Sequence, residues 1–195
     1  MAAIPISKQF VETDCPSPLR GVLPLRGFSL ACGLKLDNGA LAWQSWGTQH
    51  APVVIVLGGI SAGRDLAGWW AAQCGLGRAL DPRHQRLISI DWIGGSDASS
   101  GPRNDEEFVP VDSLDQAHAI LLLLNHLGLA QVDAVVGSSY GGCVAQHLAS
   151  LLGSRLARLV VIGAAHRASP WALALRTLQR AGVESARTPQ DRRSA

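Results

Sequence analysis

Cysteine is scarce in this sequence of 195 residues, and its four copies, Cys15, Cys32, Cys74 and Cys143, lie far apart. There is no C-x-x-C pair and no histidine pair beside a cysteine, so the spacing indicates neither a zinc site nor a disulfide framework. We therefore expect no bound metal. Buried thiols in a protein of the reducing cytoplasm are the interpretation that fits this pattern.

Other absences exclude further classes of protein. No apolar run approaches the roughly 20 residues of a membrane-spanning helix, and the start, MAAIPISKQFVETDCP, does not predict a secretory signal. The 17 basic residues are scattered rather than gathered in a stripe, and the formal charge is only +2, so neither a nucleic acid nor a membrane is an expected partner. With 47% apolar residues the chain is too hydrophobic to be disordered throughout.

Short apolar runs predict the strands of a sheet. Residues 28–46 are typical of an antiparallel hairpin, with strands over 28–36 and 41–46 and a turn at Asp37-Asn38-Gly39. Four β-branched runs without a polar face are typical of strands covered on both sides, as in a parallel sheet. These runs are 53–57, 87–90, 132–136 and 159–162.

Helical patterns alternate with these runs. We predict helices over 113–127, opened by a capping box from Ser113 to Gln116, over 140–152, ended by Gly153, and over 170–180. Strands that alternate with helices indicate the α/β class with a mostly parallel sheet. The predicted organisation is an N-terminal extension (1–27), a core (28–180) and a disordered tail (181–195) whose residues bury too little surface to order themselves.

The strongest chemical signal is Gly137-Ser138-Ser139-Tyr140-Gly141. This G-x-S-x-G pattern lies between a predicted strand and a predicted helix, where a sharp turn would lift Ser139 above the sheet as a nucleophile. The helix N-terminus would favour negative charge developing at that point. The alternative is an ordinary helix-capping serine in a glycine-rich turn.

An oxyanion hole needs two backbone donors. The N–H of Tyr140, directly after the nucleophile, is one candidate, and the N–H of Ile60 in Gly58-Gly59-Ile60-Ser61 is the other. A tight glycine turn without function remains the alternative for that second segment.

These residues resemble the homoserine O-acyltransferases of the α/β-hydrolase superfamily over roughly residues 28–180. The resemblance is carried by the Ser139 motif and by Gly58–Gly63, Gly68-Trp69-Trp70, Gly77–Asp81, Asp91–Ser96, Ser99–Pro102, Gly163–Arg167 and Leu178–Arg180. It implies an α/β-hydrolase fold and a ping-pong transfer from acetyl-CoA or succinyl-CoA, through an acyl-Ser139, to homoserine in methionine biosynthesis. Acyl-CoA would then be a co-substrate, with no bound cofactor, and full-length members of the family are often homodimers.

The sequence departs from that family in two respects. Tyr140 stands where a methionine commonly follows the nucleophile, and no downstream Asp and His match the rest of the triad, so we interpret the chain as an amino-terminal half, truncated before the lid and the last strands. His166 and Asp91 fall at the edge of the sheet where ligands bind and are candidates for substrate binding. For both, a simple role in a loop is the alternative.

Three functions remain open at this point. The first is the acyltransferase, the second is an esterase of the same fold that uses water as acceptor, and the third is a non-catalytic fragment of the acyltransferase. The sequence decides neither between acetyl and succinyl donors nor between homoserine and serine as acceptor.

Overall fold

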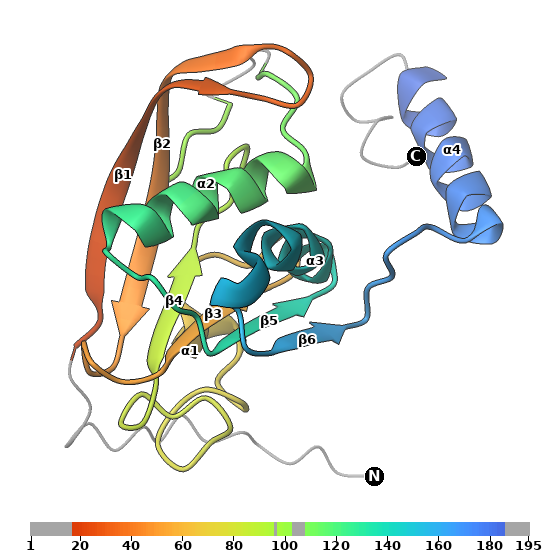
Figure 1. Ribbon diagram of the computed structural model, residues 1–195. Coiled ribbons are helices and arrows are strands. Elements are labelled where there is room, and N and C mark those ends of the chain that lie inside the picture. The colour runs from red at the N-terminus through yellow and green to blue at the C-terminus, as the bar shows by residue number, and fades with distance from the viewer. Residues whose placement is uncertain (1–16, 96, 103–107, 186–195) are drawn as a thin grey trace, which may run out of the picture. The chain divides into compact units, whose positions relative to one another are not determined.

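A six-stranded sheet organises the chain in the computed structural model, which describes residues 17–95, 97–102 and 108–185 (Figure 1). The strands lie in the order β1-β2-β4-β3-β5-β6. β1 and β2 pair antiparallel, β2 also runs antiparallel to β4, and the remaining neighbours are parallel. The strands are β1 (Leu19–Ser29), β2 (Lys35–Trp46), β3 (Val53–Leu57), β4 (Arg86–Ile90), β5 (Ala134–Ser138) and β6 (Leu159–Ile162). A mostly parallel sheet with an antiparallel hairpin confirms the predicted α/β architecture.

Both faces of the central strands are covered, which explains why these strands have no polar face. Successive side chains of a strand point to opposite faces. In β3, Ile55 and Leu57 belong to the cluster under α2 (Ser113–His126) and α3 (Tyr140–Leu152), which cover one face of the sheet (Figure 1). Val54 and Val56 belong to a second cluster, with Leu66 of the short helix α1 (Leu66–Trp69).

The hairpin is confirmed, but its predicted turn is wrong. The chain reverses at residues 30–34, where Leu30 and Leu34 are hydrogen-bonded and Gly33 takes a positive φ of 86°. Asn38 and Gly39 lie inside β2, opposite Arg26 and Leu25. Asp-Asn-Gly has the local chemistry of a turn, but pairing along the full length of β1 and β2 outweighs that preference. Residues 19–27, predicted as part of an N-terminal extension, therefore lie in the sheet.

The predicted helices form, with one correction at a helix start. α2 begins at Ser113 as predicted, yet its capping box is formed by Asp112 and Asp115 rather than by Ser113 and Gln116. α3 has the predicted bounds and a 3-10 turn, η1 (Gly153–Arg155), follows it. β5 begins at Ala134, two positions after the predicted start.

The chain divides into two units, residues 1–164 and residues 165–195. The second unit contains α4 (Pro170–Ser185), which continues past the predicted end at Arg180, so residues 181–185 of the predicted tail are helical. Residues 186–195 of that tail, like residues 1–16 of the predicted extension, lie outside the described part. Across the residues that are described, no helix is both long enough and apolar enough to cross a membrane.

Candidate active site

Ser139 lies at a sharp turn between β5 and α3. Its φ of 52° and ψ of −120° make it the one non-glycine residue with positive φ in the described part of the chain. Such a backbone conformation is disfavoured for a residue with a side chain and persists only where the surrounding structure imposes it. The Ser139 side chain makes no capping hydrogen bond to α3. The geometry is therefore that of a nucleophile elbow and differs from that of an ordinary capping serine.

Glycines make this turn possible because backbone segments cross without space for a side chain. A Cβ on Gly137 would collide with the carbonyl oxygen of Gly141, and a Cβ on Gly141 would collide with the carbonyl oxygens of Leu57 and Gly58. The Gly141 N–H donates to the Gly58 carbonyl oxygen at 2.9 Å. The elbow is thus bonded directly to the loop that follows β3.

The two predicted oxyanion donors come from these two segments. Tyr140 is the first residue of α3, and an N–H at this position has no acceptor within its own helix. The Ile60 N–H binds no acceptor among the described residues. Gly59, next to Ile60, lies so near the elbow that a Cβ placed on it would be 3.9 Å from the Ser139 Cβ. Both donors therefore belong to segments that meet at Ser139.

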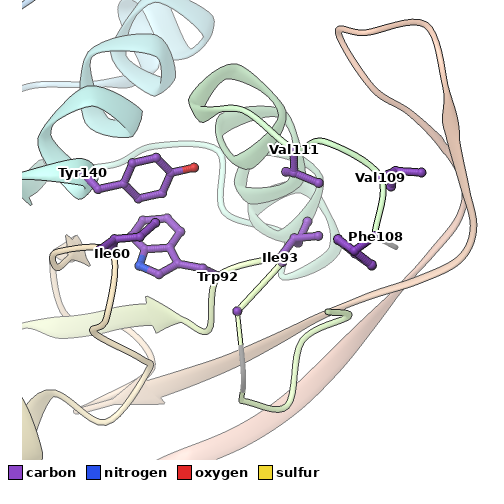
Figure 2. Close-up of a pocket in the computed structure, with 9 residues that line it drawn as sticks. Ile60, Trp92, Ile93, Phe108, Val109, Val111 and Tyr140 are labelled. Atoms are coloured by element: carbon purple, nitrogen blue, oxygen red, sulfur yellow. The ribbon is translucent and has the colours of Figure 1, made fainter. Parts of the chain in front are cut away.

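A cavity of about 320 Å³ opens beside these segments (Figure 2). Ile60 and Tyr140 line it, together with Trp92 from the loop after β4. The rest of its wall is mainly apolar and includes Ile93, Phe108, Val109 and Val111. The cavity therefore offers a mainly apolar surface next to the residue that follows Ser139.

Tyr140, whose N–H is one of the two predicted donors, also forms an aromatic part of the cavity wall. Its ring packs edge to face on Trp92, with centroids 5.0 Å apart and planes at 78°. Burial raises the pKa of the Tyr140 hydroxyl above its usual value, although a hydrogen bond with the Gln116 side chain acts in the opposite direction. The hydroxyl is therefore protonated at neutral pH. Tyr140 thus places a neutral polar group in this wall.

Asp91 is buried, at 3% exposure, and its carboxylate is occupied by groups of two loops. Its Oδ1 accepts the Arg64 N–H at 2.7 Å, its Oδ2 accepts the Ala98 N–H at 3.1 Å, and the Arg64 guanidinium lies 3.2 Å from Oδ2. These contacts favour loop capping over direct substrate contact, the two roles that the sequence left open for Asp91.

His166 is exposed and belongs to the second unit, so its part in substrate binding stays a prediction.

In the described ranges, no group of three or more His, Cys, Asp or Glu side chains could hold a metal ion. Cys74 is buried, as expected for a thiol in the core. Cys32 is exposed and Cys143 is half-buried, so the expectation of buried thiols is wrong for these two.

Two residues of the site were not anticipated from the sequence. The Trp92 indole N–H donates to the Gly59 carbonyl oxygen at 2.9 Å. The buried Gln116 side chain donates to the Ile93 carbonyl oxygen at 2.7 Å and accepts the Ile93 N–H at 3.2 Å. A glutamine among the apolar positions of α2 was a usable signal, since buried polar groups need partners. Trp92 lies in Asp91–Ser96, one of the segments that carry the resemblance, but nothing in that segment predicts its hydrogen bond to Gly59.

Residues 52–186 match the family model of the alpha/beta hydrolase fold. The chain belongs to this family. Membership agrees with the order of the sheet and with the position of Ser139 at the strand-to-helix turn. The α/β-hydrolase fold expected from the resemblance is thus confirmed.

Relatives within this family share most of the chain. It is 39% identical to a homoserine O-succinyltransferase of Xanthomonas campestris, over 88% of this chain and 46% of the relative. It is 31% identical to a homoserine O-acetyltransferase of Deinococcus radiodurans, over 88% of this chain and 53% of the relative. The crystal structure of esterase E22 superposes with a TM-score of 0.78 at 19% identity, over 90% of this chain and 55% of that one. The chain therefore spans about half the length of the relatives it matches.

Proposed function

We propose that the chain carries the nucleophile half of a CoA-dependent homoserine O-acyltransferase of methionine biosynthesis. The observation that carries the proposal is the elbow: Ser139 has the strained backbone of a nucleophile and lies against the loop of Ile60. The similarity to homoserine O-succinyltransferase and O-acetyltransferase supports this choice of substrates. Both acetyl-CoA and succinyl-CoA remain candidate donors. The same names support a cytoplasmic enzyme that acts on small molecules.

In the proposed first half-reaction, the Ser139 Oγ attacks the thioester carbon of acyl-CoA while a base takes the hydroxyl proton. The carbonyl oxygen becomes an oxyanion, which the N–H groups of Ile60 and Tyr140 stabilise. The C–S bond then breaks, coenzyme A leaves as its thiol after taking up a proton, and the acyl group stays on Ser139.

In the second half-reaction the homoserine hydroxyl attacks the acyl-serine, and the same two N–H groups bind the second oxyanion. The base takes the proton of the attacking homoserine hydroxyl. Collapse of the intermediate then breaks the bond between the acyl carbon and the Ser139 Oγ, which receives this proton as O-acylhomoserine leaves. Acyl-CoA acts throughout as a co-substrate. We further propose His166 as a residue near the substrate and Asp91 as the residue that holds the neighbouring loops, and a homodimer remains a prediction for the full-length family.

The test is to incubate the purified 195-residue chain with acetyl-CoA or succinyl-CoA, with and without homoserine, and to measure thiol release and the mass of the Ser139 peptide. Because no downstream Asp and His in this sequence match the rest of the triad, we expect slow acylation of Ser139 and slow thiol release that depends on homoserine. Ser139→Ala should abolish both signals. Ser138→Ala is the matched control, since it removes the neighbouring hydroxyl and should retain them.

An esterase that uses water as acceptor is the second candidate, because the structure of esterase E22 has the same fold. Thiol release that is independent of homoserine, with acyl-Ser139 still present, would favour the esterase. If no acyl-Ser139 forms with either donor, the catalytic proposal fails and a non-catalytic fragment is the better description.

A further inference from the structure

We propose that Trp92 is a positioning residue that orients the Ile60 N–H of the oxyanion hole. The inference rests on the proposed function of Ser139, and it assigns a role in that reaction to a residue outside the serine motif and the glycine loop.

The first step in the argument is the direction of one peptide group. The described residues contain no cis peptide bond, and in a trans peptide the C=O and the following N–H point in opposite directions. The Gly59 carbonyl oxygen and the Ile60 N–H belong to the same peptide group. That oxygen accepts two hydrogen bonds, from the Trp92 indole at 2.9 Å and from the Ala62 N–H at 3.0 Å. Because these two donors hold the oxygen, they also fix the opposite direction of the Ile60 N–H.

The second step is that Trp92 contacts both halves of the site. Its indole N–H donates to the carbonyl oxygen of the peptide group that carries the Ile60 N–H. Its ring packs edge to face on Tyr140, the residue with the other donor. Figure 2 shows the Trp92 ring below the Tyr140 ring at one end of the cavity, the end at which Ile60 also lies. One side chain thus relates the loop after β3 to the start of α3.

The third step is that Trp92 is itself held firmly. It is buried, at 5% exposure. The Asp91 N–H donates to the Ala42 carbonyl oxygen of β2 at 2.9 Å, and both backbone groups of Ile93 are bound by the Gln116 side chain. With the residues before and after it anchored to β2 and α2, the indole has a defined position from which to orient a neighbour. Orientation of a backbone donor before reaction is the main source of oxyanion-hole catalysis.

The test compares Trp92→Phe with Trp43→Phe in the full chain. Phenylalanine at position 92 keeps an aromatic ring against Tyr140 and removes the indole N–H. Trp43 is the matched control because, among the described residues, its buried indole nitrogen has no hydrogen-bond partner. Two readouts are needed: amide hydrogen exchange at Ala62, and the pre-steady-state rate of Ser139 acylation by p-nitrophenyl acetate.

For Trp92→Phe we expect faster exchange at Ala62 and an acylation rate constant lower by about tenfold, with KM unchanged, since a small misplacement of a catalytic group costs rate more than binding. Trp43→Phe should change neither readout. Unchanged exchange in Trp92→Phe would overturn the proposal, and so would faster exchange with an unaltered acylation rate. If the unmodified chain forms no acyl-serine, the proposed function fails, and the exchange at Ala62 alone decides whether Trp92 holds the loop.

A measurement on the unmodified chain covers the case in which Trp92→Phe does not fold. The indole proton of Trp92 can be assigned through its contact with Tyr140, the one tyrosine in the sequence. A resonance shifted downfield relative to that of Trp43 would support the hydrogen bond to Gly59. Equal shifts for the two indole protons would overturn it.

Discussion

The backbone of Ser139 shows how a local conformation is imposed by its surroundings. A serine gains nothing by itself from a φ of 52°; the conformation persists because Gly137 and Gly141 allow β5, α3 and the loop after β3 to approach closely. In this turn the Ser139 hydroxyl makes no capping hydrogen bond to α3. The proposed function uses this hydroxyl as the nucleophile.

A first prediction at this scale concerns that strain. Ser139→Gly should raise the free energy of unfolding by about 1 kcal/mol, because glycine adopts positive φ without steric conflict, while acylation is lost. Urea denaturation monitored by circular dichroism measures the change. Ser138→Gly is the control, and it should lower the free energy of unfolding by roughly 0.5–1 kcal/mol, since Ser138 has ordinary strand geometry. A destabilising Ser139→Gly substitution would contradict the interpretation of strain.

A second prediction concerns Tyr140, which alone reports tyrosine ionisation in this chain. Because burial raises its pKa, ultraviolet titration of the folded chain should give a midpoint above 10.0, which falls toward 10.0 in denaturant. A group with a raised pKa in the folded state contributes stability that is present below its unfolded pKa and is lost as the pH rises through the folded pKa. Stability should therefore fall above pH 10.0. Identical midpoints with and without denaturant would contradict the burial of this hydroxyl.

At the scale of elements, the start of α2 connects the hairpin to the helical layer. The buried Asp115 carboxylate accepts the Ala31 N–H of the hairpin turn at 2.7 Å and the Asp112 N–H at 3.0 Å. Asp112 in turn accepts the N–H groups of Leu114 and Asp115. One aspartate therefore caps the helix, and the other also connects the helix to β1 and β2.

A third prediction separates these two roles. Asp112→Ala should lower the free energy of unfolding by about 1 kcal/mol, the usual effect of losing an N-cap. Asp115→Ala should lower it by about 2–3 kcal/mol, because it also leaves the Ala31 N–H without its acceptor in a partly buried position. Denaturation curves of the two variants provide the test. Equal losses would show that the bond to the hairpin turn contributes little.

At the scale of the whole molecule, β6 presents an apolar surface. Among the described strands it lies at one edge of the sheet and pairs only with β5. The Val161 side chain faces α3, where it approaches Gly142, so its neighbours Val160 and Ile162 point to the opposite face and are 43% and 46% exposed. An apolar edge strand with free backbone groups is a site for pairing with other chains.

A fourth prediction follows for the 195-residue chain in isolation. It should aggregate at micromolar concentration, and Val160→Lys should reduce this aggregation, since a charge on an edge strand opposes pairing. Leu122→Lys is the matched control: it adds the same charge to α2, beside β1 rather than β6, at a similarly exposed position (45%), and should have little effect. Light scattering against concentration measures both. A monomeric chain with a sharp cooperative melt would contradict the prediction.

Much of the fold and the elbow was predictable because the signals are local. Runs of β-branched residues such as 53–57 need to be covered on both faces wherever they fold. The glycines of Gly137–Gly141 suit a sharp strand-to-helix turn, because that turn leaves no space for a side chain at either glycine. The same kind of local signal, a glycine loop that follows a strand, led to Ile60, whose role as an oxyanion donor stays a prediction.

The remaining features depend on partners distant in sequence. Asp37-Asn38-Gly39 has turn chemistry, yet the pairing of β1 with β2 places the reversal at residues 30–34. Gln116, predicted as a cap, binds Ile93 instead, and Trp92 binds the carbonyl oxygen of Gly59, 33 positions away. The sequence alone predicted most of the strands and helices and the sharp turn at Ser139, because those properties follow from neighbouring residues. Only the tertiary structure decided which polar groups meet, because a hydrogen bond depends on the separation of two atoms in space, and distant segments acquire that separation by packing together.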